Sequence, residues 1–125
     1  MSIERREAEF LCTGSEFQLF HESCEPWIRQ FQAGSIRRSM ERAAKLSDLW
    51  LSKAAADRQE ARERRGKARL HSITGHVLAR RKAELFSQIA QRLCDRLAVL
   101  AEIARLGHGV PSEETPIPIT RSSRD

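Results

Sequence analysis

The sequence has little of what a membrane-spanning or secreted protein needs. Its apolar runs are only a few residues long, far short of the ~20 residues that cross a bilayer. The N-terminal region is charged from its fourth residue on and has no apolar segment of the kind a signal peptide needs, so no signal peptide is expected. The charged residues are Glu4, Arg5, Arg6 and Glu7. The three cysteines are an odd number without a pairing pattern, which favours a reducing compartment. These features predict a cytoplasmic protein that does not contact membranes.

Sequence signatures of catalysis and of metal or cofactor binding are also absent. The chain has no glycine-rich phosphate loop, no G-x-S-x-G and no H-E-x-x-H. His21 and Cys24 have a ligand-like spacing, but a tetrahedral zinc site needs four ligands and there is no second pair. His71 and His76 are five residues apart, which does not place them on one face of a helix. We therefore predict that the protein is not an enzyme and holds neither a cofactor nor a metal.

Residues 36–106 have the composition of long helices. They contain no proline and only two glycines, Gly66 and Gly75, among many helix-forming residues. At 100° per residue the apolar side chains fall on two stripes, one over residues 36–54 and one over residues 85–104. Two antiparallel helices joined by a short link would bury these stripes against each other.

The two apolar stripes run in mirror order, which predicts a helical hairpin that turns near residue 70. This register places Ile36 opposite Ala104 and Ala54 opposite Leu85. A break is expected near Gly75, because the apolar residues just before and after it lie off the second stripe if one helix is simply continued. These off-stripe residues are Leu70, Ile73 and Val77. The predicted helices cover about 36–65 and 76–106.

Short N-terminal helices and an extended C-terminal tail complete the prediction. Residues 1–35 hold five of the seven aromatic residues, and helices are expected over 3–12, over 15–23 and from Glu25, with Pro26 in the first turn of the last. Gly34 is expected to stop the last of these and Ser35 to cap the next helix. These helices would pack at the base of the hairpin, since two helices alone bury little surface. The prediction is thus an all-α single domain over 1–106 and a flexible tail over 107–125, which is rich in proline.

Positive charge is concentrated between the two apolar stripes. Residues 53–82 carry ten basic and three acidic side chains, whereas the whole chain has a net charge of +5. Four arginines are spaced i, i+4, i+7 and i+11, which would place them on one helical face, here called the arginine stripe. They are Arg58, Arg62, Arg65 and Arg69. The hairpin would point Lys82, beside Arg80 and Arg81, toward this stripe with no acid between. With Lys67 these eight residues form the predicted contact surface.

The arginine stripe predicts binding to phosphate groups. The planar guanidinium matches phosphate, and a basic stripe along a helix is typical of nucleic-acid binding. Few aromatic residues accompany the stripe, so we expect contacts with the nucleic-acid backbone and no sequence preference. A solvated charged face with i,i+4 ion pairs and a surface for an acidic protein are the other interpretations.

Two functions follow from this layout of charge and apolar surface. The first is a non-enzymatic helical subunit of a larger complex that binds nucleic-acid backbone. The alternative is a protein–protein adaptor, or an assembly or secretion-type helical-hairpin protein, with an acidic partner for the basic tip. Self-association through the stripe from Leu85 to Ala104 is also expected, because its apolar spacing alternates between three and four residues as in coiled coils.

Overall fold

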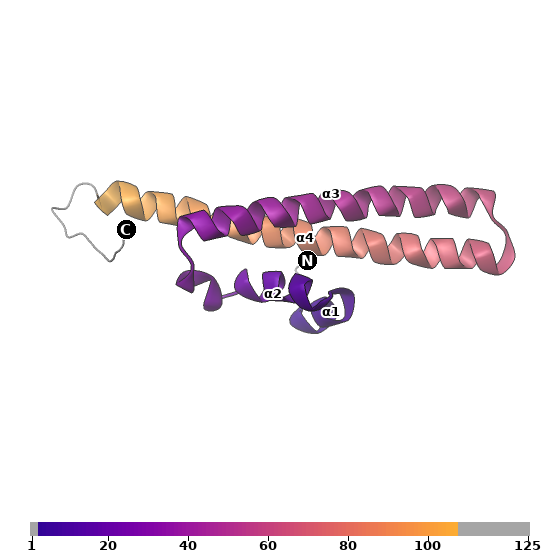
Figure 1. Cartoon of the computed structure of the whole chain (residues 1–125), viewed down its shortest axis with the longest axis horizontal. Coiled ribbons are helices and arrows are strands. Elements are labelled where there is room, and N and C mark those ends of the chain that lie inside the picture. Colours follow the sequence, from indigo (N-terminus) through magenta and orange to yellow (C-terminus); the bar gives the residue numbers. More distant parts are fainter. Residues whose placement is uncertain (1–2, 108–125) are drawn as a thin grey trace.

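The computed structural model describes residues 3–107 and shows a long helical hairpin with a short helical segment along one side (Figure 1). Helices α3 and α4 are antiparallel and form the hairpin, and residues 3–107 contain no strand. The elements are α1 (Arg5–Leu11), α2 (Gly14–Glu22), the 3-10 helix η1 (Trp27–Gln30), α3 (Ala33–Glu63) and α4 (Gly66–Gly107). The predicted all-α hairpin with short N-terminal helices is confirmed. Apart from Gly107, which ends α4, the predicted tail lies outside the described residues.

The apolar core lies in the base half of the hairpin, away from the turn. There α1, α2 and η1 run beside α3 and α4 (Figure 1). The α4 side chains Phe86, Leu85 and Ile89 are fully buried in this half. The buried cluster consists of Ile3, Ala8, Leu19, Phe20, Ile28, Ile36, Ala43, Leu85, Phe86, Ile89 and Leu93. Burying each large apolar side chain contributes about 1.5–3 kcal/mol to stability. The first half of the stripe predicted for self-association is therefore used within the chain, and only residues near its end, such as Ile103, stay exposed.

The turn of the hairpin lies at Arg64 and Arg65, not near residue 70. Gly66 begins α4 with a φ of +61°, a left-handed conformation that glycine adopts without a steric cost. The earlier turn changes which residues of α3 and α4 lie opposite each other. Ser47 Oγ donates to the carbonyl oxygen of Ala83 at 3.1 Å, so these two residues are neighbours across the hairpin. The predicted pairing of Ile36 with Ala104 and of Ala54 with Leu85 is thus wrong. Helix α4 has 42 residues and α3 has 31, so the last turns of α4 extend past the beginning of α3 (Figure 1).

Gly75 does not break α4, which is continuous from Gly66 to Gly107. A Cβ at position 75 would lie 2.9 Å from Oδ2 of Asp57, a buried residue of α3. Asp57 is held there by Lys53, whose Nζ lies 3.2 Å from Oδ1. Glycine at this position therefore serves a close approach of the two helices. The three apolar side chains that suggested a break lie exposed along α4: Leu70, Ile73 and Val77.

The N-terminal segment matches the sequence prediction in outline and differs in detail. The backbone N–H of Thr13 donates to Glu16 Oε1 at 3.0 Å, which caps α2. The helix expected from Glu25 is only the short 3-10 helix Trp27–Gln30, and α3 begins at Ala33 after Gln32, so Ser35 is not its cap. Gly34 was expected to end the preceding helix, but it is the second residue of α3 and lies in the first turn of that helix. No helix between residues 3 and 107 is long and apolar enough to span a membrane.

Candidate nucleic-acid interface

A hollow lined by basic side chains lies between α3 and α4 in the tip half of the hairpin. We call it the basic groove, and its volume is about 280 Å³. Helix α3 contributes Leu51, Ala54, Ala55, Arg58, Gln59 and Arg62, and helix α4 contributes His76 and Arg80. The wall contains three arginines and no acidic residue, so its charge is strongly positive.

Helix geometry and one cross-hairpin hydrogen bond position the arginines of the basic groove. Arg58 and Arg62 are four residues apart on α3 and therefore share a face, while Arg80 reaches the groove from α4. The Nδ1 atom of His76 lies 2.9 Å from the carbonyl oxygen of Ala54. A carbonyl oxygen only accepts hydrogen bonds, so Nδ1 carries the proton and donates it. This bond links α3 to α4 at the groove.

The arginines of the basic groove are not neutralised by neighbouring acids. Among the ion pairs within residues 3–107, none includes Arg58, Arg62 or Arg80. Two nearby acids of α3 pair with other residues, since Asp57 contacts Lys53 and Glu60 lies 3.7 Å from Arg64 Nε. A third, Glu63, accepts a hydrogen bond from Gln59 Nε2 at 3.1 Å. The interpretation as a solvated face with i,i+4 pairs thus holds for Arg64 but not for Arg62.

The four residues of the predicted arginine stripe do not share one helical face. Arg58 and Arg62 lie on α3, but α3 ends at Glu63 and the chain reverses at Gly66. Arg65 is in the turn, and Lys67 and Arg69 are in the first turn of α4, all exposed. The prediction of one continuous face is therefore wrong. The structure instead has two basic surfaces, the groove and the extreme tip.

Arg81 is engaged by acids, and it ties α1 to α4. Its Nε and Nη2 atoms donate to the two carboxylate oxygens of Glu7 at 2.5 and 2.8 Å, and Nη1 lies 3.3 Å from Glu84 Oε1. The hydrogen bonds from Arg81 lower the pKa of Glu7 below its ordinary value. The same bonds raise the pKa of Arg81. This bidentate pair makes Arg81 a structural contact between helices.

Lys82 is also paired, contrary to the expectation that no acid would face it. Its Nζ lies 3.0 Å from Glu16 Oε1 and 4.0 Å from the centre of the Trp50 ring. The side chains of Lys82 and Glu16 are only 13% and 11% exposed, so the ion pair is enclosed. The acid comes from α2, which packs on α4 beside α3. Of the eight predicted contact residues, Arg81 and Lys82 form ion pairs, and the other six take part in none of the ion pairs of residues 3–107.

The histidines and cysteines do not form a metal site in the described part of the chain. No three His, Cys, Asp or Glu side chains come together there as ligands. His21 Nδ1 lies 3.0 Å from Arg5 Nη2, and Cys24 Sγ donates to the carbonyl oxygen of Phe20 at 3.3 Å. Burial raises the pKa of the Cys12 thiol to about 11, which keeps it protonated and unreactive.

The role of His76 in the groove was not predicted from the sequence, where this residue was weighed only as a metal ligand. Its position four residues before Arg80 could have indicated it, because residues i and i+4 share a helical face.

No protein-family model, no curated protein and no solved structure matches the chain.

Proposed function

We propose that the protein is a non-enzymatic helical subunit that binds the phosphate backbone of nucleic acid through the basic groove and the hairpin tip. The observation that carries this proposal is the wall of the groove. Arg58 and Arg62 from α3 and Arg80 from α4 surround one hollow that no acidic residue lines. Guanidinium groups bind phosphate oxygens in pairs of parallel hydrogen bonds.

The rest of the groove favours contacts with the backbone over contacts with bases. Its apolar wall consists of Leu51, Ala54 and Ala55, and none of its lining residues is Phe, Tyr or Trp. Base stacking on a protein needs aromatic or similar planar platforms. Arg65, Lys67 and Arg69 extend the positive charge to the tip without adding such a ring. Binding is therefore expected to depend on salt and to show no sequence preference.

The decisive experiment measures how the affinity for a short labelled duplex depends on salt. If three to five phosphates are engaged, the slope of log affinity against log salt is about −3 to −4.5. The variant with Arg58→Gln, Arg62→Gln and Arg80→Gln removes three charges while keeping helix propensity, and it reduces this slope by up to about 3. Fluorescence anisotropy with DNA and RNA duplexes of two unrelated sequences gives the slope and the sequence dependence together.

The matched control removes three positive charges from the base half. Arg37, Arg38 and Arg105 are exposed and lie outside the basic groove, so their replacement by Gln lowers the net charge equally. Binding should weaken much less in this control than in the groove variant. Equal weakening would mean that only net charge matters. If the wild type fails to bind at low salt, the proposal is wrong and the adaptor with an acidic partner takes its place.

A further inference from the structure

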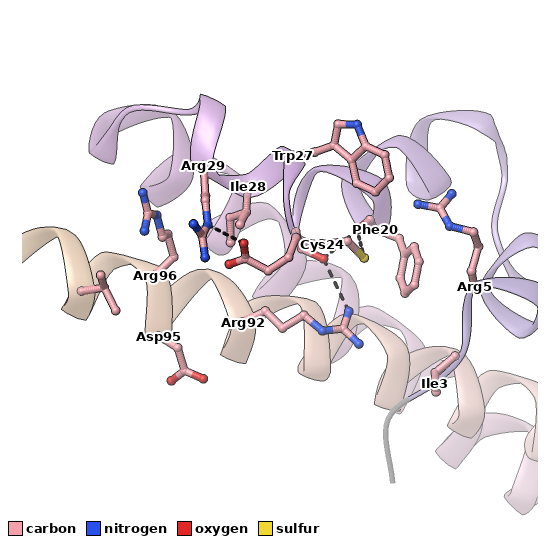
Figure 2. A pocket seen from close by; sticks show the side chains of 13 residues that line it. Ile3, Arg5, Phe20, Cys24, Trp27, Ile28, Arg29, Arg92, Asp95 and Arg96 are labelled. Carbon is pink, nitrogen blue, oxygen red and sulfur yellow. Dashed lines mark hydrogen bonds and ion pairs between the residues drawn. The ribbon is translucent and has the colours of Figure 1, made fainter.

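A second hollow lies at the base of the hairpin, between η1 and α4 (Figure 2). We call it the base pocket. Its volume is about 630 Å³, and it shares no residue with the basic groove. Its principal side chains are Arg5, Phe20, Trp27, Arg29, Arg92 and Arg96. The pocket thus combines four guanidinium groups with two aromatic rings.

Rings and a hydroxyl hold two of these arginines in place. The guanidinium carbon of Arg5 lies 5.4 Å from the centre of the Trp27 ring. That of Arg92 lies 5.3 Å from the centre of the Phe20 ring, and its Nη1 is 3.5 Å from Ser23 Oγ. These contacts position a guanidinium without neutralising it. The charges of Arg5 and Arg92 therefore remain available to an anion.

Arg96 has a buried donor that is not satisfied by the described part of the chain. Its Nε atom is enclosed and has no hydrogen-bond partner there. A buried donor without an acceptor is costly, so a shift of the Arg96 side chain toward an acceptor in the pocket is favourable. Figure 2 shows Arg29 and Arg96 at the same end of the pocket, so an acceptor placed there would meet two guanidinium groups.

The two carboxylates in the wall do not cancel this positive charge. Glu25 accepts a hydrogen bond from Arg29 Nε at 2.6 Å. Asp95 accepts one from Gln91 Nε2 at 2.9 Å, and in Figure 2 it points away from η1. Four basic residues thus face two acids, and within residues 3–107 Arg5, Arg92 and Arg96 form no ion pair.

The apolar part of the wall restricts the kind of anion that fits. Phe20 and Trp27 stand with Ile28 along the side formed by α2 and η1. Trp27 is 37% exposed although it is one of the largest apolar side chains of the domain. Phe20 and Ile28 are already buried, so Trp27 is the ring that a ligand can cover. A bare inorganic ion would leave it in contact with water, whereas a ligand with a flat apolar body would cover it.

We propose that the base pocket binds a small oxyanion, a carboxylate or a phosphate monoester, that is carried by a flat apolar group. The oxyanion accepts hydrogen bonds from Arg96 and its neighbour Arg29, with Arg92 adding charge, and the apolar body packs against the exposed part of Trp27. This site does not depend on the function proposed for the basic groove, since the two hollows have separate walls.

Phenyl phosphate and phenylacetate are suitable probes, because each joins an oxyanion to a ring. Trp27 reports on the pocket, and Trp50→Phe leaves it as the one tryptophan of the chain. In this background we expect a saturable change in tryptophan fluorescence with a dissociation constant of about 1 mM or lower. Inorganic phosphate and benzyl alcohol, which each lack one half of the ligand, should bind at least ~10-fold more weakly.

Single substitutions test the assignment within the pocket. Arg96→Gln should weaken phenyl phosphate binding about 10-fold or more, because charge-assisted hydrogen bonds are lost. Arg105→Gln removes the same charge from an exposed position of α4 outside the pocket and should leave the affinity unchanged. Trp27→Ala, followed by calorimetry, should weaken phenyl phosphate binding but not the binding of inorganic phosphate. Circular dichroism melts of each variant check that it is folded.

Three results would overturn the proposal. They are the absence of saturable binding by either probe, equal affinity for inorganic and phenyl phosphate, and equal effects of Arg96→Gln and Arg105→Gln. The variant with Arg58, Arg62 and Arg80 replaced by Gln should keep its affinity for phenyl phosphate, because these residues lie in the basic groove. Failure of duplex binding and failure of probe binding are therefore separate outcomes.

Discussion

The two halves of the hairpin are built from different kinds of side chain. In the base half, α1, α2 and η1 cover α3 and α4, and the buried residues are large, such as Phe86 and Leu85. In the tip half α1 reaches only the end nearest the base, where Phe10 and Leu11 line a hollow with Ala79, and the buried residues are small or polar. They are Ala54, Asp57, Ala61, Ser72 and Ala79. Small side chains are enclosed between the two helices of the tip half, whereas the large side chains of the base half are also covered by the N-terminal helices.

This division separates the buried core from the basic groove. The tip half is held by close approach at Gly75 and by polar contacts across the hairpin, such as His76 Nδ1 to the carbonyl oxygen of Ala54. The unpaired arginines of the basic groove contribute none of the buried contacts of the base half. They can therefore carry charge for a partner without being required for folding.

The largest effect is expected from removing the central aromatic side chain of the base half. Phe86 is fully buried between the N-terminal segment and the hairpin, so Phe86→Ala should lower the free energy of unfolding by about 3–5 kcal/mol. Leu78→Ala, on the tip half of the same helix at 43% exposure, should cost less than about 1 kcal/mol. Urea unfolding followed by circular dichroism compares the two. Equal losses would show that the halves do not differ in this way.

The hairpin was predictable from the sequence because its apolar residues repeat with the helical period. The apolar stripe from Leu85 to Leu93 must be buried whichever residues of the other long helix lie opposite it, and the aromatic N-terminal segment offers the apolar side chains that can cover it. The position of the turn was not predictable from the same pattern. Gly66 and Gly75 are the two glycines of the segment, and a positive φ at one and a close approach at the other cannot be told apart in sequence.

The candidate site was predictable in composition but not in arrangement. The concentration of arginine in residues 53–82 was enough to predict Arg58, Arg62 and Arg80 as contact residues. That they line one groove depends on how α3 and α4 are aligned, which the position of the turn determines. Arg81 has one near partner in Glu84, but Glu7 of α1 and Glu16 of α2, which pair with Arg81 and Lys82, lie more than 60 residues away along the chain. No periodicity relates them. A long-range ion pair of this kind needs the tertiary structure.

The turn of the tip half gives a second, smaller test of the comparison. Gly66 has a positive φ, and a Cβ there is strained even though it meets no other atom within 4 Å. Gly66→Ala should therefore lower the free energy of unfolding by about 1–2 kcal/mol. Gly34→Ala is the matched control, since Gly34 lies in α3 with ordinary space for a Cβ and should be neutral or slightly stabilising. Thermal melts compare the stability of the two variants with that of the wild type. An unchanged stability of Gly66→Ala would show that the turn does not require a positive φ at this position.

The smallest effect concerns Glu7, which joins α1 to α4 where the base half meets the tip half. Its hydrogen bonds from Arg81 lower its pKa in the folded state below the ordinary value of 4.5. The unfolded chain thus takes up the proton first as the pH falls. The stabilisation by this pair is complete well above pH 4.5 and disappears as the pH drops through the lowered folded value.

Glu7→Gln should therefore reduce the free energy of unfolding at neutral pH and have progressively less effect in acid. Because both side chains are about one third exposed, the loss at neutral pH is expected to be below about 1 kcal/mol. Glu9→Gln, an exposed position on α1 that takes part in none of the ion pairs of residues 3–107, should run parallel to the wild type at every pH. Urea unfolding across the acid range measures all three proteins. A Glu7→Gln curve that stays parallel to the wild type down to the lowest pH would show that the pair with Arg81 does not stabilise the attachment of α1.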